Sequence, residues 1–290
     1  MENPLFSGTC TALVTPFEDD HVNFDMLACL LERQILAQIP AVVLCGTTGE
    51  SATLSDAEKL DIFRFAKNTV GDRIKIICGT GSNHTAHAVQ LSMAAEEAGA
   101  DALLLVSPYY NKGNPQGLLE HFSTIAHAVN IPIILYNVPS RTGLDMSVSL
   151  YQQLSQIPNI IGVKEASTDI VKIARIRNAC GEDFTVWCGN DDQAVPAIAL
   201  GAKGVISVIS NLLPKETLEM TSAIYDGDLD TALDLHGKLL PVMDALFKEV
   251  NPIPVKEAMK LIGYDCGVCR LPLGPVSNDT RNLLQQLLCS

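Results

Sequence analysis

The stretch Ile160-Ile161-Gly162-Val163-Lys164 is a continuous apolar run that ends in a lysine. Strands buried on both faces of a parallel sheet have such runs, whereas half-exposed strands alternate apolar and polar residues. Similar runs recur about 20 to 35 residues apart, which is the spacing of strand–helix units. Together with this stretch they number eight; the other seven are Thr9–Val14, Val42–Cys45, Ile74–Cys78, Ala102–Val106, Ile133–Tyr136, Thr185–Cys188 and Val205–Val208.

Eight buried strands with intervening helices favour a (β/α)8 TIM barrel over an open doubly wound sheet. Helix starts are marked by Ser55-Asp56-Ala57-Glu58, which has the pattern of a capping box, and by Pro115. The residues after the eighth strand are too many for one closing helix. Their helical patterns cover Pro214–Tyr225, Leu229–Phe247, Pro254–Ile262 and Asp279–Leu288. We therefore predict a catalytic barrel over residues 1–225 and a C-terminal helical domain over residues 226–290.

Composition limits the function classes. The chain has 290 residues, 47% hydrophobic content and a formal net charge of −13, which argues against nucleic-acid or anionic-membrane binding. It shows no signal-peptide pattern and no apolar segment near the roughly 20 residues that span a bilayer, so we expect a cytoplasmic protein. Nine cysteines scattered through apolar segments indicate reduced thiols. The single CxxC, Cys266–Cys269, has no second pair for zinc, so no metal is expected.

Lys164 is the first candidate catalytic residue. Burial disfavours the ammonium form of a lysine, and a neutral amine can attack a carbonyl carbon to form a Schiff base. The alternative from the run alone is a structural lysine that pairs with Glu165 or with a helix terminus.

Polar residues follow the apolar runs where a barrel places its active site. These segments are Gly46-Thr47-Thr48-Gly49-Glu50-Ser51, Ser107-Pro108-Tyr109-Tyr110 and Tyr136-Asn137-Val138-Pro139-Ser140-Arg141. Glycines and hydroxyls can hold a small anion, an arginine can clamp a carboxylate, and phenols can transfer protons. Each segment alone is more typical of a turn, a packing residue or a solvated side chain, but their occurrence together at one barrel mouth favours a site.

In combination these motifs closely resemble the dihydrodipicolinate synthase family, part of the N-acetylneuraminate lyase and class I aldolase superfamily. The resemblance covers nearly the whole chain. Its further motifs are Gly162-Val163-Lys164-Glu165-Ala166, Asn251-Pro252-Ile253-Pro254-Val255-Lys256 and Arg270-Leu271-Pro272-Leu273. It implies a TIM barrel with a C-terminal helical domain, usually a homotetramer, that condenses pyruvate with L-aspartate 4-semialdehyde in lysine biosynthesis. It implies no cofactor beyond the covalent imine with pyruvate.

The resemblance also assigns roles to single residues. Lys164 would form the imine and Tyr136 would act as general acid and base. Thr47 and Tyr110 would complete the proton relay, with the tyrosine reaching across a subunit interface. Further matches are Thr48 for the pyruvate carboxylate, Arg141 for the carboxylate of the semialdehyde, and Gly189 and Ile206 for the lining of the pocket.

Many members of this family are inhibited by lysine at a dimer interface, and the match here is partial. Ser51, Ala52, Gly81, Asn83 and Tyr109 fit the inhibitor-contacting pattern. Asp56 and Lys59 replace histidines of the sensitive type, and His87 replaces a glutamate. Loss of a carboxylate removes the partner of the α-ammonium group, and a lysine adds a like charge. We therefore predict weak or absent inhibition by L-lysine.

Three alternatives stay open at this stage. The related sugar-acid lyases share the imine, but they generally lack an arginine at position 141 and have serine at position 47. A metal-dependent aldolase would need a third ligand beside His84 and His87, and none is apparent. A non-catalytic barrel would bind pyruvate without turnover.

Overall fold

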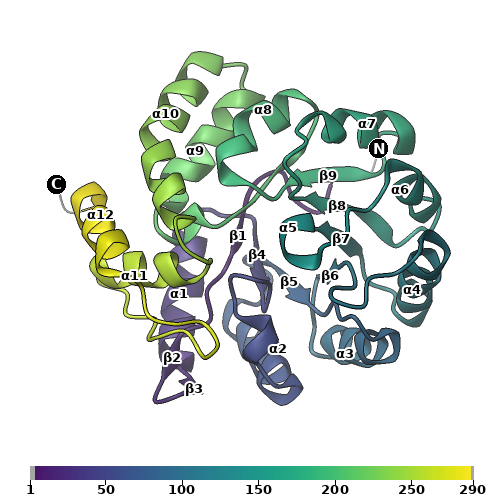
Figure 1. Ribbon diagram of the computed structural model, residues 1–290, viewed down its shortest axis with the longest axis horizontal. Coiled ribbons are helices and arrows are strands. Elements are labelled where there is room, and N and C mark those ends of the chain that lie inside the picture. Colours follow the sequence, from purple (N-terminus) through teal and green to yellow (C-terminus); the bar gives the residue numbers. More distant parts are fainter. Residues whose placement is uncertain (1–3, 289–290) are drawn as a thin grey trace.

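The computed structural model describes residues 4–288, and its eight parallel strands form a closed barrel. The hydrogen-bonded order is β1-β10-β9-β8-β7-β6-β5-β4, and helices surround the strands (Figure 1). The predicted TIM barrel is therefore confirmed, and every predicted apolar run forms a barrel strand. The strands are β1 (Gly8–Ala12), β4 (Ala41–Leu44), β5 (Lys75–Gly79), β6 (Ala102–Val106), β7 (Ile133–Asn137), β8 (Ile160–Glu165), β9 (Thr185–Cys188) and β10 (Gly204–Ser207).

The outer layer consists of helices that begin near the carboxyl ends of the strands. They are α1 (Phe24–Leu36), α2 (Asp56–Val70), α3 (Thr85–Glu97), α4 (Pro115–Ala128), α6 (Val148–Leu154), α7 (Val171–Cys180), α8 (Ala194–Ala199) and α9 (Pro214–Tyr225). The predicted helix starts are correct. Ser55 and Glu58 form a reciprocal capping box on α2, and Asn114 caps α4, whose first residue is Pro115.

Short elements interrupt the strand–helix alternation near the carboxyl ends of the strands. A two-stranded hairpin, β2 (Phe17–Glu18) with β3 (His21–Val22), follows β1. The one-turn helix α5 (Pro139–Thr142) follows β7 directly. Three 3-10 turns complete the set: η1 (Ser51–Thr53), η2 (Asp191–Gln193) and η3 (Ile209–Asn211).

The C-terminal helices pack beside the barrel (Figure 1). They are α10 (Leu229–Leu246), α11 (Ile253–Leu261) and α12 (Asn278–Leu288), close to the predicted bounds. The loop before α11 returns to the barrel mouth, where Asn251 bonds to Thr48. The division at residues 225 and 226 stays a prediction, because this loop shares contacts with the barrel. None of the helices within residues 4–288 is long and apolar enough to cross a membrane.

Two apolar clusters fill the molecule, one between strands and helices and one inside the barrel. The inner cluster is closed by Phe6, which precedes β1. Its ring stacks on Trp187 with centroids 4.9 Å apart, and the indole N–H donates to the Phe6 carbonyl at 3.2 Å. The barrel is thus filled at the end where the strands start, and its open mouth is at their carboxyl ends.

Candidate active site

A cavity of about 660 Å³ opens at the carboxyl ends of the strands. Thr47 and Tyr136, from the ends of β4 and β7, line it together with Arg141 on α5. Three of the residues predicted to act in the site therefore share one cavity. Asn251, which comes from the C-terminal part of the chain, also lines it.

Lys164 lies deeper than this lining and is only 5% exposed. It pairs in register with Tyr136 on β7 and with Trp187 on β9. Its Nζ lies 4.5 Å from the centroid of the Tyr136 ring. Within residues 4–288 no carboxylate lies within ion-pair distance of this amine. The amine is therefore buried against a phenol ring and makes no ion pair with the described residues.

Glu165 pairs with Lys172 and not with Lys164, so this one of the two structural partners considered for Lys164 is wrong. Successive residues of a strand point to opposite faces, which puts Lys164 inside the barrel and Glu165 outside. The Glu165 carboxylate is buried and pairs with Lys172 at 3.4 Å. It also accepts hydrogen bonds from Asn137 and from the Tyr151 hydroxyl. Burial raises the pKa of the Tyr151 phenol. The negative charge of Glu165 and the hydrogen bond to its carboxylate raise this pKa further.

Thr48, Asn251 and Arg141 form a chain of hydrogen bonds across the mouth. The Asn251 amide donates to Thr48 Oγ1 at 3.0 Å, and Arg141 Nη2 donates to the Asn251 carbonyl at 3.1 Å. Asn251 Oδ1 is buried without a hydrogen-bond partner among the described residues. In the sequence, Asn251 stands out only as part of a family motif. Its contact with Thr48, some 200 positions earlier, has no local signal.

Glu50 anchors the loop that carries Thr47 and Thr48. Its backbone is in the left-handed region with φ 55°, and its buried carboxylate accepts from Lys256 Nζ at 2.6 Å and from the Arg270 backbone N–H at 2.9 Å. Gly49 is packed so closely that an added Cβ would lie 3.0 Å from the Cys45 nitrogen. The threonine loop is therefore held by the C-terminal part of the chain as well as by the barrel.

Gly189 lies beside the lysine, and neither Gly189 nor Ile206 is part of the cavity lining. A Cβ at Gly189 would lie 2.6 Å from Ala166 Cβ and 3.1 Å from Lys164 Cε, so only glycine fits there. Ile206 is fully buried in the inner apolar cluster. Gly189 therefore limits the space beside Lys164, and the role of Ile206 in the pocket stays a prediction.

Asp191 is a buried acid near the lysine that the sequence analysis missed. Its Oδ2 accepts from the backbone N–H groups of Val208 and Ile209, both at 2.9 Å, while Oδ1 has no partner among the described residues. Burial raises the pKa of the Asp191 carboxyl despite these bonds and the charge of Lys164. Its position after β9 places this acid at the barrel mouth.

Tyr110 lies outside the cavity. It is 92% exposed and has φ 68°, a conformation that costs a non-glycine residue about 1 kcal/mol or more. Within one chain, the predicted relay of Tyr110 with Thr47 and Tyr136 is therefore not assembled.

The predicted inhibitor-contacting residues lie mostly along the same cavity. Its lining includes Ser51, Ala52, Asp56, Lys59, Gly81, His87 and Tyr109. Asn83 is not part of the lining and donates to the Tyr109 carbonyl at 3.3 Å. His87 Nε2 lies 2.8 Å from one Asp56 oxygen, and Lys59 Nζ lies 3.8 Å from the other. The carboxylate of Asp56 is thus already engaged by two basic side chains.

Metal ligands do not gather around His84 and His87. Within the described part of the chain, no three His, Cys, Asp or Glu side chains are placed to hold an ion together. His87 instead bonds to Asp56 and to Ser82.

Comparison with known proteins agrees with this geometry. The model of the "Dihydrodipicolinate synthetase family" matches residues 5–290. The 4-hydroxy-tetrahydrodipicolinate synthase of Thermoanaerobacter sp. (strain X514) is 48% identical over 286 residues, covering 98% of this chain and 96% of the relative. That of Acetivibrio thermocellus is 46% identical over 288 residues, covering 99% and 98%. The crystal structure of dihydrodipicolinate synthase from Aquifex aeolicus superposes with a TM-score of 0.96 at 42% identity, covering 98% and 97%. The chain belongs to the dihydrodipicolinate synthetase family.

Proposed function

We propose that this protein is a 4-hydroxy-tetrahydrodipicolinate synthase, a class I aldolase-type lyase of lysine and diaminopimelate biosynthesis. It condenses pyruvate with L-aspartate 4-semialdehyde through an imine on Lys164. The proposal depends on the position of the Lys164 amine. It is buried, it lies 4.5 Å from the centroid of the Tyr136 ring, and it has no carboxylate partner in residues 4–288. Relatives of that name match along almost the whole chain, which supports the choice of reaction.

The chemistry follows from the amine. Neutral Lys164 attacks the ketone carbon of pyruvate, and water leaves to give a protonated imine. The imine accepts the electron pair left when a methyl proton departs, and the resulting enamine carbon attacks the aldehyde of the second substrate. The amine of that substrate then displaces Lys164 from the former ketone carbon and closes the ring. No external cofactor is required in this sequence.

Tyr136 transfers the protons in this proposal, because its ring lies against the Lys164 amine and it lines the cavity. Thr47 lines the same cavity, and its hydroxyl is the proposed next member of the proton relay after Tyr136. Tyr110 completes the relay from a second copy of the chain, which makes a homo-oligomer, a dimer of dimers, part of the mechanism. Its 92% exposure and left-handed backbone suit a residue that a neighbouring subunit covers.

The two substrate carboxylates are bound by different residues. Thr48 and the adjacent backbone hold pyruvate above Lys164, with Gly189 and Ile206 shaping the pocket. Arg141 holds the carboxylate of the semialdehyde, because its guanidinium lines the cavity and can form two parallel hydrogen bonds to a carboxylate. Asn251 links the two sites through its bonds to Thr48 and Arg141.

The direct test is a coupled assay of the purified protein. With pyruvate and L-aspartate 4-semialdehyde we expect condensation that feeds the next reductase, and with N-acetylneuraminate no cleavage. Thr47 and Arg141 favour the synthase over the sugar-acid lyases. Activity that survives exhaustive chelation distinguishes the imine enzyme from a metal-dependent aldolase. Cleavage of sialic acid without condensation would contradict the assignment, and pyruvate binding without any turnover would indicate a non-catalytic barrel.

Feedback inhibition by L-lysine is expected to be weak or absent. Lys59 adds a positive charge at the expected inhibitor site, His87 replaces the carboxylate expected there, and both side chains contact Asp56. Initial rates measured against L-lysine should fall little at sub-millimolar concentrations, and strong inhibition there would contradict this proposal. We place the enzyme in the cytoplasm, where the free thiols of all eight cysteines in the described residues suit a reducing compartment.

A further inference from the structure

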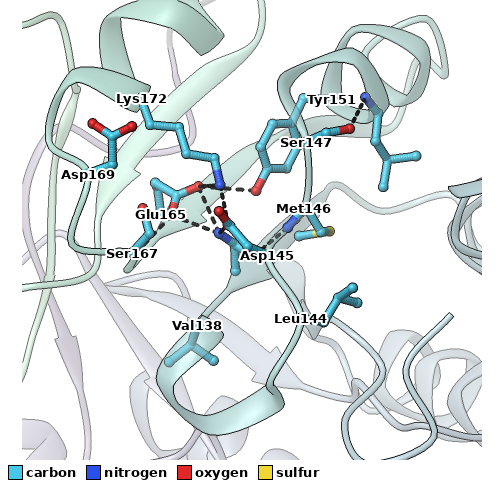
Figure 2. A network of polar contacts seen from close by, with 12 residues as sticks. Val138, Leu144, Asp145, Met146, Ser147, Tyr151, Glu165, Ser167, Asp169 and Lys172 are labelled. Atoms are coloured by element: carbon cyan, nitrogen blue, oxygen red, sulfur yellow. Dashed lines mark hydrogen bonds and ion pairs between the residues drawn. The ribbon is translucent and has the colours of Figure 1, made fainter. Parts of the chain in front are cut away.

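A buried polar network lies on the outer side of the barrel wall, directly behind the proposed catalytic pair. Figure 2 shows Glu165, Tyr151, Lys172 and Asp145 converging there. Glu165 accepts from Asn137 Nδ2 at 2.9 Å, from the Tyr151 hydroxyl at 3.1 Å and from the Ser167 backbone N–H at 2.8 Å, in addition to its pair with Lys172. These donors satisfy the hydrogen-bonding capacity of the buried Glu165 carboxylate.

The network is in register with the inner residues. Strands β7 and β8 pair Tyr136 with Lys164 and, one step on, Asn137 with Glu165. Because neighbouring residues of a strand face opposite sides, the Asn137–Glu165 contact lies back to back with the Tyr136–Lys164 contact. The Asn137–Glu165 hydrogen bond joins the two strands behind the inner pair, and it does not involve Asp145.

Asp145 extends the network to the segment that carries Arg141. Its Oδ1 accepts from Asn137 Nδ2 at 2.7 Å and from Lys172 Nζ. Asn137 Oδ1 in turn accepts from the Met146 backbone N–H at 3.1 Å. Residues 137 and 145–146 are thus bonded to each other, and the intervening residues 138–144 form a closed loop. This loop, which includes α5, places Arg141 in the cavity lining.

The charge state suits this role. Burial opposes ionisation of Asp145, but the hydrogen bonds from Lys172 and Asn137 outweigh it and lower the pKa of the carboxyl below its ordinary value. The Asp145 side chain is nevertheless 56% exposed, whereas Lys172 and Glu165 are buried. Lys172 has a second and buried partner in Glu165, so the need to pair this lysine does not by itself account for a carboxylate that joins both ends of the loop.

We infer that Asp145 is a positioning residue, which closes the 137–146 loop through Asn137 and Lys172 and thereby fixes Arg141 for the aldehyde substrate. This inference rests on the proposed function of Arg141. Asp145 itself does not touch the substrates. Its removal affects the second substrate selectively, because imine formation by Lys164 depends on the inner face of β7 and β8.

The test compares Asp145→Ala with a matched control, Asp101→Ala. Asp101 precedes β6 at the opposite end of the barrel, where it pairs with Lys67 at 3.2 Å and Lys75 at 3.1 Å. Each substitution removes one carboxylate that contacts a lysine. For both variants and the parent, kcat/KM for the semialdehyde is measured at saturating pyruvate, together with borohydride trapping of pyruvate alone and the thermal midpoint.

For Asp145→Ala we expect kcat/KM for the semialdehyde to fall roughly 10- to 100-fold, since a small displacement of a substrate clamp has effects of this size. Pyruvate trapping should stay at the parent level, and Asp101→Ala should change only the thermal midpoint. Asp145→Asn should recover most of the loss, because its amide oxygen still accepts from Asn137.

An unchanged kcat/KM in Asp145→Ala, or a loss that is equal in both variants, would overturn the inference. An equal loss of pyruvate trapping and of aldehyde use would do the same, because it would indicate a general distortion. A parent protein without condensation activity would instead contradict the proposed function, and the two failures are therefore distinguishable.

Discussion

The two ends of the barrel are built from the same eight strands but are finished in opposite ways. Where the strands start, Phe6 stacks on Trp187 and fills the interior. Where they end, the interior gives way to a cavity, and Lys164 lies buried without an ion partner in the described residues. The end where the strands start is thus packed for stability, and the end where they finish has the cavity. TIM barrels in general have this division between a stability face and an active-site face.

Unpaired polar atoms show the same contrast. Most buried polar groups in proteins have a hydrogen-bond partner, so the exceptions are informative. Five buried side-chain atoms among residues 4–288 have none, on Ser107, His121, Ser167, Asp191 and Asn251. Ser107, Ser167 and Asp191 follow the ends of β6, β8 and β9, and Asn251 lines the cavity. Only His121, within α4, lies away from the strand ends. Unsatisfied groups therefore gather at the mouth where substrates would bind.

The largest expected effect comes from the open end. Lys164→Ala should reduce turnover by roughly 10⁴-fold or more, because covalent catalysis is lost altogether. The thermal midpoint should stay close to that of the parent, since no partner charge is left unpaired. Steady-state rates and thermal unfolding check both statements, and near-parental activity would refute the role of this amine.

A substitution at the closed end should lower the free energy of unfolding and leave turnover unchanged. Phe6→Ala removes the ring that stacks on Trp187 and should cost about 3–5 kcal/mol of unfolding free energy. Urea unfolding measures this cost. At a temperature where the Phe6→Ala variant is folded, its kcat should match that of the parent. A loss of kcat as large as that of a variant at the open end would contradict the proposed difference between the two ends.

Arg141→Ala tests the rim of the open end. Hydrogen bonds to a charged group contribute about 1.5–3 kcal/mol, so kcat/KM for the semialdehyde should fall roughly 10- to 100-fold. Pyruvate trapping should be retained. An unchanged kcat/KM for the semialdehyde would exclude the proposed clamp.

The smallest effect at neutral pH concerns His121, whose Nε2 is the buried atom without a partner away from the mouth. Burial lowers its pKa to about 4 from an ordinary value of 6.5. The folded protein therefore disfavours the imidazolium, and stability is lost as the pH falls from about 6.5 to about 4, by at most about 1.4 kcal/mol per pH unit. His121→Gln should flatten this slope in urea unfolding without changing turnover at neutral pH. A slope equal to that of the parent would contradict the assignment.

Much of the fold was predictable because buried parallel strands leave a local signal. Runs such as Ile160–Val163 are apolar throughout, and the Ser55–Glu58 capping box and Pro115 mark helix starts within a few residues. The short hairpin β2–β3 has too few residues for such a signal and was not predicted.

The partners within the site were much less predictable. Glu165 was considered as a partner of Lys164, yet strand alternation turns it outward to Lys172. Asn251 reaches Thr48 only because the C-terminal part folds back over the mouth, and no local pattern encodes that contact. The positions of Thr47, Tyr136 and Arg141 followed from strand ends, whereas the exposure of Tyr110 depends on a left-handed loop residue that propensity does not indicate.

The most direct test of the central claim is borohydride reduction in the presence of pyruvate, followed by mass spectrometry of the intact chain and its peptides. We expect the mass of one reduced pyruvate adduct per chain, located on Lys164, and none in Lys164→Ala. An unchanged mass in the parent, or an adduct on a different lysine, would contradict the account.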